Sequence, residues 1–223
     1  MHDQPAKVTW SDDGVPVSAR FDDPYYSMAD GFAETRHVFL DGNDLPMRFC
    51  PGFTMAELGF GTGLTLACSL AAWRRAGIDG PLRFVSFEAQ PMNPKDMARA
   101  LAAFPEIAEL ATDIAERLRG GAHNLSIADL EFSLVVGDAR ETLPYWTGSA
   151  DAWCLDGFSP AKNPELWEPA LMAEVARHTA PEGTFATYTA AGHVRRALAN
   201  AGFEVMRCPG FGKKRHMSRG HLK

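Results

Sequence analysis

The sequence alternates short apolar segments with amphipathic ones, and this order constrains its fold more than any other feature. The amphipathic segments carry apolar residues at spacings of three and four, which is typical of helices, and Gly77 and Gly202 mark probable helix ends. Strands that alternate with helices, and that are too apolar for one face to meet water, predict a mostly parallel sheet covered on both sides. The predicted strands are 53–58, 82–88, 131–137, 151–156 and 184–189.

The remaining segments fit one domain, residues 1–223, with a Rossmann-like core over 51–223. After Gly202 two apolar segments follow each other without a helix, which predicts one antiparallel strand at the C-terminal end. Residues 1–50 alternate apolar and polar side chains around turn dipeptides, and we expect a small β appendage there. Residues 92–130 are expected to form an almost wholly helical insertion.

Composition excludes several classes of protein. The chain has 46% hydrophobic residues and a net charge of −6, and no apolar segment approaches the roughly 20 residues that a bilayer requires. We expect a cytoplasmic protein without a membrane segment. The four cysteines, at positions 50, 68, 154 and 208, lack the spacing of a zinc site, so no metal is expected.

A glycine-rich turn follows the first core strand in "AELGFGTGLTL". Glycines let a backbone approach a ligand closely, and the start of a helix favours anionic oxygens. Leu64 stands where a dinucleotide-binding fingerprint requires glycine. This difference argues against the hypothesis that the chain is a nicotinamide oxidoreductase. The spacing resembles the first motif of S-adenosylmethionine-dependent methyltransferases, although a tight structural turn is the alternative. The predicted cofactor residues of this motif are Glu57, Gly59, Gly61 and Gly63.

One acidic residue ends each of the next three core strands: Glu88, Asp138 and Asp156. Open α/β sheets bind ligands at this edge, so the three acids predict a cofactor site. Glu88 would accept hydrogen bonds from ribose hydroxyls, and Asp138 with the backbone N–H of Ala139 would contact adenine, as is common in methyltransferases. The structural alternatives are a solvated turn acid for Glu88 and a helix N-cap for Asp138.

The loop "DGFSPAK" after the fourth core strand predicts a substrate site. Asp156 would lie at the reactive end of the cofactor, where it could attract an ammonium group and take its proton. Phe158 and Pro160 would form a stiff wall for a flat ring, and Lys162 would contact the substrate. A turn acid and a core aromatic are the structural alternatives for Asp156 and Phe158.

Long segments of the chain resemble the methyltransferase domain of the MnmC family, which acts in tRNA 5-methylaminomethyl-2-thiouridine biosynthesis. These include "RFDDPYYS", "ETRHVFLDGNDLPMRF", "ELGFGTGL", "DAWCLDGFSPAKNPELW" and "GFGKKRHM". The resemblance implies S-adenosylmethionine-dependent conversion of a 5-aminomethyl wobble uridine in tRNA to 5-methylaminomethyluridine. It also implies that Asn43 lies close to the cofactor. The flavin-dependent oxidase part of the family does not follow, so we expect the aminomethyl substrate to be made elsewhere.

A basic cluster near the C-terminus is expected to contact tRNA phosphates although the whole chain is acidic, while a solubilising tail is the alternative. Its residues are Lys213, Lys214, Arg215, Arg219 and Lys223, with Arg195 and Arg196 on a preceding helix, and the predicted tRNA contacts among them are Lys213, Lys214 and Arg215. Two other functions stay open at this point. One is a non-catalytic S-adenosylmethionine-binding partner of a separate oxidase, and the other is an aminopropyltransferase, which uses a related cofactor.

Overall fold

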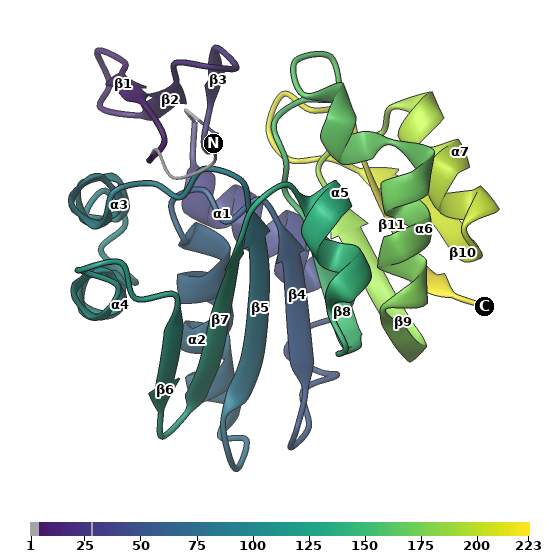
Figure 1. The fold of residues 1–223 in the computed structure, drawn as a ribbon, viewed down its shortest axis with the longest axis horizontal. Helices are drawn as coiled ribbons and strands as arrows, with labels where there is room; N and C mark the ends of the chain where they lie inside the picture. The colour runs from purple at the N-terminus through teal and green to yellow at the C-terminus, as the bar shows by residue number, and fades with distance from the viewer. Residues whose placement is uncertain (1–4, 28) are drawn as a thin grey trace.

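A computed structural model describes residues 5–27 and 29–223, and a sheet of eight strands forms the centre of this part. The strands follow in the order β10-β11-β9-β8-β4-β5-β7-β6. The predicted parallel sheet is confirmed, and the fourth core strand lies beside the first, as expected for an open α/β sheet (Figure 1). The parallel strands are β4 (Thr54–Leu58), β5 (Leu82–Glu88), β7 (Leu130–Val136), β8 (Ala150–Leu155) and β9 (Thr179–Thr187).

The C-terminal end of the sheet contains the predicted antiparallel strand. β10 (Phe203–Pro209) and β11 (His216–Leu222) form a hairpin, and β11 is inserted between β9 and β10, antiparallel to both. The loop over 210–215 that joins the two strands reaches toward the carboxyl ends of the parallel strands. It therefore brings residues from the end of the sequence to the edge where ligands bind.

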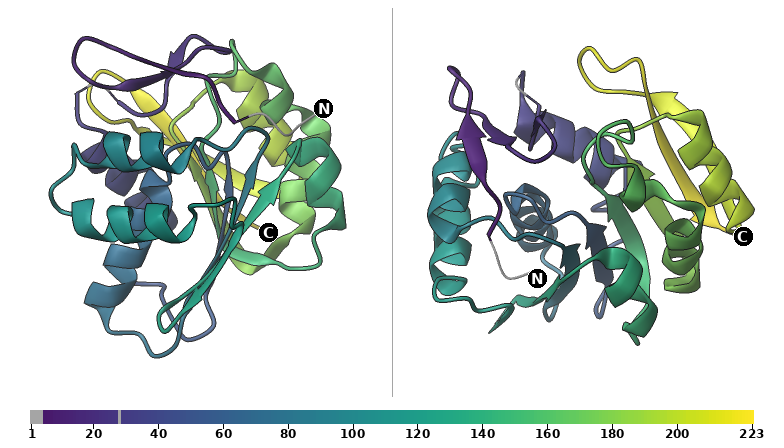
Figure 2. Two further views of the ribbon diagram at one scale, coloured as in Figure 1. Left: turned by 60° about the vertical axis from the view of Figure 1, so that its left-hand side comes forward. Right: turned by 45° about the horizontal axis from the view of Figure 1, so that its top comes forward.

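Helices cover both faces of the sheet (Figure 2). Successive strand residues enter opposite layers: Ala152 and Cys154 pack in one hydrophobic core and Trp153 in the other. This burial on both faces explains why β8 lacks polar alternation. The first core contains α2 (Leu64–Ala76), α3 (Pro94–Leu101) and α4 (Ala108–Arg117), and the second contains α5 (Ala139–Thr142), α6 (Pro169–Arg177) and α7 (Gly192–Asn200).

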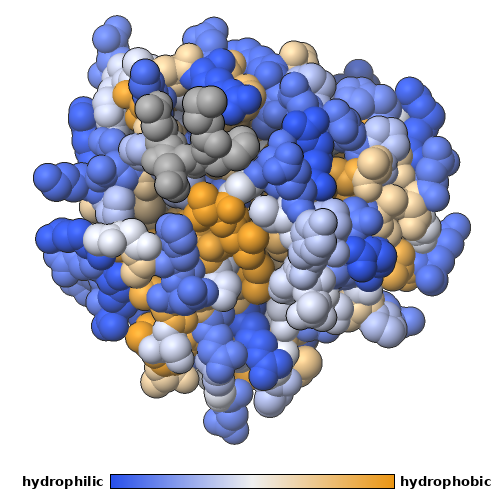
Figure 3. Space-filling view, viewed as in Figure 1, coloured by the Kyte–Doolittle hydropathy of each residue, from blue (hydrophilic) through white to orange (hydrophobic). Residues whose placement is uncertain are grey.

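The short helix α5 leaves part of its face of the sheet uncovered. Val85 and Val135 are therefore only partly buried, and Arg83 forms an exposed ion pair with Glu131 at 3.2 Å. Figure 3 shows this face as mostly hydrophilic, with one apolar area near its centre.

The sequence predicts an almost wholly helical insertion over 92–130, and the structure differs at its end. Helices α3 and α4 form as expected, but β6 (Asn124–Ile127) then pairs antiparallel with β7 at the edge of the sheet. Gly120 and Gly121, both with positive φ, follow the end of α4. In the strand, Leu125 and Ile127 pack against the core while Asn124 stays exposed, a period of two that the sequence reading missed.

The predicted β appendage over residues 1–50 is only partly correct, and its residues 1–4 and 28 lie outside the described part. A three-stranded antiparallel sheet of β1 (Val8–Trp10), β2 (Pro16–Ser18) and β3 (Asp23–Pro24) does form (Figure 1).

The appendage then continues with helical turns in place of further strands: α1 (Gly31–Thr35), a π-helix (Arg36–Leu40) and a 3₁₀-helix (Asp41–Asn43). Asp30 caps α1 by accepting a hydrogen bond from the Ala33 backbone at 2.8 Å. The three successive apolar residues Val38, Phe39 and Leu40 are all buried. A strand with one face in water cannot bury three residues in a row, whereas a helix turn packed between layers can.

Within residues 5–27 and 29–223, no helix combines the length and the apolarity that crossing a bilayer requires.

Candidate functional site

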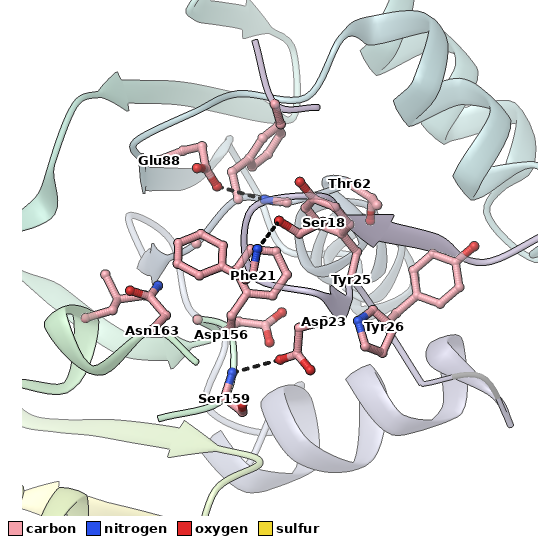
Figure 4. Close-up of a pocket in the computed structure, with 18 of the residues that line it drawn as sticks. Ser18, Phe21, Asp23, Tyr25, Tyr26, Thr62, Glu88, Asp156, Ser159 and Asn163 are labelled. Atoms are coloured by element: carbon pink, nitrogen blue, oxygen red, sulfur yellow. Dashed lines mark hydrogen bonds between the residues drawn. The ribbon is translucent and has the colours of Figure 1, made fainter. Parts of the chain in front are cut away.

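A cavity of about 470 Å³ lies between the carboxyl ends of the central strands and the small N-terminal sheet. This volume is within the roughly 300–1,000 Å³ that is typical of small-molecule sites. Its wall includes Gly59 and Gly61 after β4, Glu88 at the end of β5, Asp138 after β7 and Asp156 after β8. Figure 4 shows Glu88 and Asp156 around the same space as side chains of the N-terminal sheet. The structure thus brings the three predicted strand-end acids to one cavity.

The turn from β4 into α2 has a backbone that favours glycine. The φ angles of Gly59 and Gly61 are +90° and +54°, both in the left-handed region. A Cβ on Gly59 would lie 2.5 Å from the carbonyl oxygen of Asp156, so this turn touches the loop after β8. Gly63 has φ +79° and begins α2, but it does not line the cavity. Of the predicted glycines, Gly59 and Gly61 therefore line the cavity and Gly63 shapes the turn.

Two glutamates near this turn have different positions. Glu88 lines the cavity, where Oε2 accepts a hydrogen bond from the Gly61 backbone at 3.2 Å and Oε1 from the Gln90 backbone at 2.8 Å. Each carboxylate oxygen has a second lone pair, so Glu88 can still accept from a ligand. Glu57 is fully buried outside the cavity and accepts a hydrogen bond from Ser86 at 2.6 Å. Burial raises the pKa of both groups, that of Glu57 well above its usual range.

Asp138 is the N-cap of α5, the structural alternative that the sequence allowed. Its carboxylate accepts from the Arg140 backbone at 2.9 Å and pairs with the Arg140 guanidinium at 2.6 Å. Asp138 and Ala139 both line the cavity. Asp138 therefore caps the helix and also lines the cavity.

Asp156 directly follows β8, and its backbone N–H donates to the Leu58 carbonyl at 3.0 Å. Burial raises the pKa of its carboxyl group to about 7, although the nearby Lys214 ammonium opposes this shift; the Glu34 carboxylate adds to it. A group with this pKa can take up or release a proton near neutral pH, which a base in a proton transfer requires.

An aromatic wall stands beside Asp156. The ring of Phe158 lies 4.8 Å from the ring of Phe21 and 5.0 Å from that of Tyr25, centroid to centroid. The Arg20 guanidinium is 4.9 Å from the centre of the Phe21 ring. The Phe158 carbonyl accepts a hydrogen bond from the Trp167 indole at 2.9 Å, which fixes the loop. Both the loop and the N-terminal sheet therefore supply flat apolar surface to the cavity.

Asp23 of β3 connects the N-terminal sheet to the loop after β8. Its carboxylate accepts a hydrogen bond from the Ser159 backbone at 2.9 Å (Figure 4) and pairs with Lys162 at 3.3 Å. Lys162 also donates to the Asp22 carbonyl. Neither Pro160 nor Lys162 lines the cavity, so the predicted substrate contacts of these two residues do not follow from the structure. Lys162 instead holds the N-terminal sheet against the loop.

The prediction that Asn43 lies against the cofactor is corrected by its surroundings. Asn43 is completely buried and does not line the cavity. Its amide donates to the carbonyls of Phe39 at 2.9 Å and Trp153 at 3.2 Å, and its oxygen accepts from Thr184 at 2.6 Å. These bonds join the N-terminal helical segment to β8 and β9, which is a structural role.

The predicted basic cluster divides into two parts. Lys214 lines the cavity and donates to the Glu34 carboxylate at 2.8 Å, while its ammonium lies 4.3 Å from the centre of the Tyr188 ring. Lys213 and Arg215 are exposed and do not line the cavity. Their positions at its margin leave them accessible to a large ligand.

The sequence reading missed several residues of the cavity. Phe21, Asp23 and Tyr25 stand in the quoted segment "RFDDPYYS", but nothing in their spacing placed them over the core strands. Glu34 and Tyr188 also line the cavity, and only the fold brings them there. Among the described residues no group of three or more His, Cys, Asp or Glu side chains is arranged to hold a metal ion.

Comparison with protein families gives one match over just more than half of the chain. The model of a family described as S-adenosyl-L-methionine-dependent methyltransferase matches residues 103–223. Among solved structures, MnmC2 from Aquifex aeolicus superposes with a TM-score of 0.78 at 24% identity, over 99% of this chain and 72% of that one. Spermidine synthase from Thermotoga maritima gives 0.55 at 12% identity, over 97% and 71%. These two likenesses show the fold alone.

Curated relatives are more similar in sequence. The tRNA 5-methylaminomethyl-2-thiouridine biosynthesis bifunctional protein MnmC of Stutzerimonas stutzeri (strain A1501) is 45% identical over 231 residues, which cover 99% of this chain and 35% of the relative. The protein of the same name from Caulobacter sp. (strain K31) is 47% identical over 221 residues, 93% of this chain and 37% of the relative. The chain thus spans about a third of the length of these relatives. These matches confirm the resemblance to the methyltransferase domain of the MnmC family.

Proposed function

This chain belongs to the family of S-adenosyl-L-methionine-dependent methyltransferases, and from this premise we propose that it methylates the 5-aminomethyl group of a wobble uridine in tRNA. The product would be 5-methylaminomethyluridine, with or without a 2-thio group. The chain is a methyltransferase that uses S-adenosylmethionine. The choice of substrate rests on its identity with the longer MnmC proteins.

One observation carries the proposal. A carboxyl group that titrates near neutral pH, Asp156, shares a cavity with a glycine-lined turn, a strand-end glutamate and an aromatic wall. Methyl transfer to a primary amine needs a site for the methyl donor, a group that takes a proton and a surface that orients the acceptor. The cavity offers side chains for each of these requirements.

The proposed cofactor residues line the cavity at the carboxyl ends of β4, β5 and β7. Gly59 and Gly61 would hold the methionine part, because both line the cavity and a glycine backbone lets a ligand approach closely. Glu88 would accept hydrogen bonds from the two ribose hydroxyls, and Asp138 with Ala139 would lie along the adenine. When bound, S-adenosylmethionine supplies a methyl group on a positively charged sulfur.

Asp156 would act on the amine. An alkylammonium resembles the lysine side chain, whose pKa is about 10, so it carries a proton at neutral pH and has no free lone pair. The carboxylate of Asp156 would attract this cation and accept one proton from it, which leaves the nitrogen lone pair free to attack. Because the pKa of Asp156 is about 7, its ionised form prevails above that pH.

The aromatic wall would orient the base. Stacking of a base on an aromatic side chain contributes about 1–3 kcal/mol. Phe158 is fixed by Trp167 and faces Phe21 and Tyr25, so a uracil ring against this wall would hold its 5-substituent at a constant distance from Asp156. Positioning of this kind lowers the entropic cost of the reaction and excludes water.

The exposed Lys213 and Arg215 would bind phosphates of the tRNA at the cavity margin. The aminomethyl group must be generated before methylation, so we propose that another modification reaction on the tRNA precedes the methyl transfer. A tRNA substrate of this kind would place the reaction in the cytoplasm.

The test is nucleoside mass spectrometry of tRNA that carries the 5-aminomethyl group, after incubation with methyl-labelled S-adenosylmethionine. The proposal predicts label on the aminomethyl nitrogen and a loss of at least about 100-fold in Asp156→Asn. Asp129→Asn is the matched control, because Asp129 pairs with Arg74 and does not line the cavity. Label on a ring carbon, polyamine products with a decarboxylated cofactor, or full activity of Asp156→Asn would refute the proposal.

A further inference from the structure

An ion pair lies on the cavity wall near Asp156 and belongs to neither the glycine turn nor the aromatic wall. The ammonium of Lys214, in the loop between β10 and β11, is 2.8 Å from the carboxylate of Glu34 in α1. The two residues are 180 positions apart in the sequence, and both line the cavity. The ammonium also lies 4.3 Å from the centre of the Tyr188 ring, within cation–π range. Two contacts therefore fix one positive charge at this place.

Fold stability alone does not account for this pair. The side chain of Glu34 is only 10% exposed, whereas that of Lys214 is 45% exposed. Burying a carboxylate costs free energy that an ion pair only partly returns, and replacement of such a pair by apolar side chains is often neutral or stabilising. A helix as short as α1 would pack at least as well with an apolar residue at position 34. We therefore look for a role of this ion pair in the cavity that both residues line.

Several titratable groups share the cavity with Asp156 or lie buried close to it. Burial raises the pKa of Cys154 and of Tyr188 above their usual values, so these two groups are neutral at pH 7. Burial also raises the pKa of Glu57 well above its usual range, which favours its uncharged form. Asp23 faces the same space from β3, and its charge is paired with Lys162. Glu88 lines the cavity from the end of β5 and is held by the backbone of the glycine turn. Against this background, Lys214 and Glu34 act on Asp156 with opposite sign.

We propose that Glu34 and Lys214 are positioning residues whose ion pair sets the electrostatic potential at Asp156 and thereby the pH range in which Asp156 can take a proton from the substrate amine. The electrostatic part of this proposal concerns the free protein, and the catalytic consequence rests on the proposed methyl transfer to an amine. Glu34 holds Lys214 at a fixed place, and Lys214 keeps a fraction of Asp156 ionised at neutral pH.

The proposal gives each variant a direction. Lys214→Met keeps the unbranched stem over Tyr188 but removes the positive charge, so the ionised form of Asp156 loses stabilisation and its pKa rises. Glu34→Gln removes the negative charge and leaves Lys214 unpaired, so the pKa of Asp156 falls. The double variant removes both charges and returns the pKa toward that of the unmodified chain. Lys214→Arg keeps the charge and leaves the pKa close to its original value.

The first experiment measures the pKa of Asp156 in the free protein by ¹³C NMR titration of its carboxyl group. We expect a rise of about one pH unit in Lys214→Met, a tenfold gain in proton affinity, and a fall of similar size in Glu34→Gln. Lys213→Met is the matched control, because the neighbouring lysine does not line the cavity. Equal titration curves for Lys214→Met and Lys213→Met would overturn the proposal. The comparison of Lys214→Met with Lys213→Met tests the proposal even if Glu34→Gln fails to fold.

The second experiment measures kcat/KM for methylation of aminomethylated tRNA as a function of pH. The acid limb of the profile should move to higher pH in Lys214→Met and to lower pH in Glu34→Gln, in step with the NMR values. A purely structural pair would lower kcat or thermal stability and leave the limb in place, which contradicts the proposal. If the unmodified chain does not methylate this tRNA, the proposed function fails while the NMR result still decides the role of the pair.

Discussion

Replacement of Gly59 by alanine tests whether the glycine turn and the loop after β8 form one rigid unit. The φ of Gly59 is +90°, and a Cβ there would lie 2.5 Å from the carbonyl oxygen of Asp156. Gly80 has nearly the same backbone, with φ +83°, but a Cβ there meets nothing within 4 Å. Gly59→Ala and Gly80→Ala therefore share the cost of a left-handed alanine, about 1–2 kcal/mol, and differ in the clash alone.

The clash can be relieved only if the Asp156 backbone shifts by at least about half an ångström, because Cβ atoms do not approach other atoms within 3.0 Å. Overpacking of this kind costs about 1–3 kcal/mol. We therefore expect Gly59→Ala to lose about 2–5 kcal/mol in urea unfolding, against about 1–2 kcal/mol for Gly80→Ala. A misplacement near 1 Å lowers rates about 100-fold, so methyl transfer should fall in Gly59→Ala and stay unchanged in Gly80→Ala.

Both quantities can be measured on the same samples, by urea titration followed by fluorescence and by methyl transfer from labelled cofactor. Equal losses of stability in the two variants would show that the loop after β8 yields freely to the turn. Equal methyl transfer would show that the position of Asp156 does not depend on Gly59. Either result would refute the view that close packing between the two loops fixes Asp156.

Three further predictions follow from the same cavity. Because burial raises the pKa of Asp156 to about 7, its ionisation destabilises the folded state as pH rises from about 4 to 7. Asp156→Asn should therefore stabilise the protein by about 3 kcal/mol more at pH 8 than at pH 4.5 in urea unfolding, and a pH-independent difference would contradict this cause. Phe158→Ala should weaken tRNA binding by about 1–3 kcal/mol and leave cofactor binding unchanged, whereas Phe158→Tyr should retain both; equal affinity of all three forms in calorimetry would exclude stacking. Lys213→Ala and Arg215→Ala should each reduce the slope of log affinity for tRNA against log salt by about one, and an unchanged slope would remove these residues from the interface.

The sequence predicted the central part of the fold because there local pattern and tertiary position agree. The apolar segment that ends before Asp156 is buried on both faces, and the one that ends at Glu88 is buried on one face and partly covered on the other; such segments form parallel strands. Since the carboxyl ends of parallel strands meet at one edge, the acids that follow them could be assigned to one cavity from sequence alone.

The sequence did not predict features that depend on contacts between distant segments. Phe21 and Tyr25 reach the cavity only because the small N-terminal sheet lies over the carboxyl ends of the strands. The ion pair of Glu34 and Lys214 joins residues 180 positions apart, and no pattern in the sequence predicts it. The segment around Val38 alternated well enough to suggest a strand, but packing between the sheet and α2 selected a helix.

The most direct test of the account is a crystal structure of the chain with S-adenosylhomocysteine and an anticodon stem-loop that carries 5-aminomethyl-2-thiouridine. The account predicts the ribose of the cofactor product at Glu88, the uracil against Phe158, and the amine nitrogen within hydrogen-bond distance of the Asp156 carboxylate. A base bound outside this cavity, or an Asp156 side chain turned away from the amine, would contradict it.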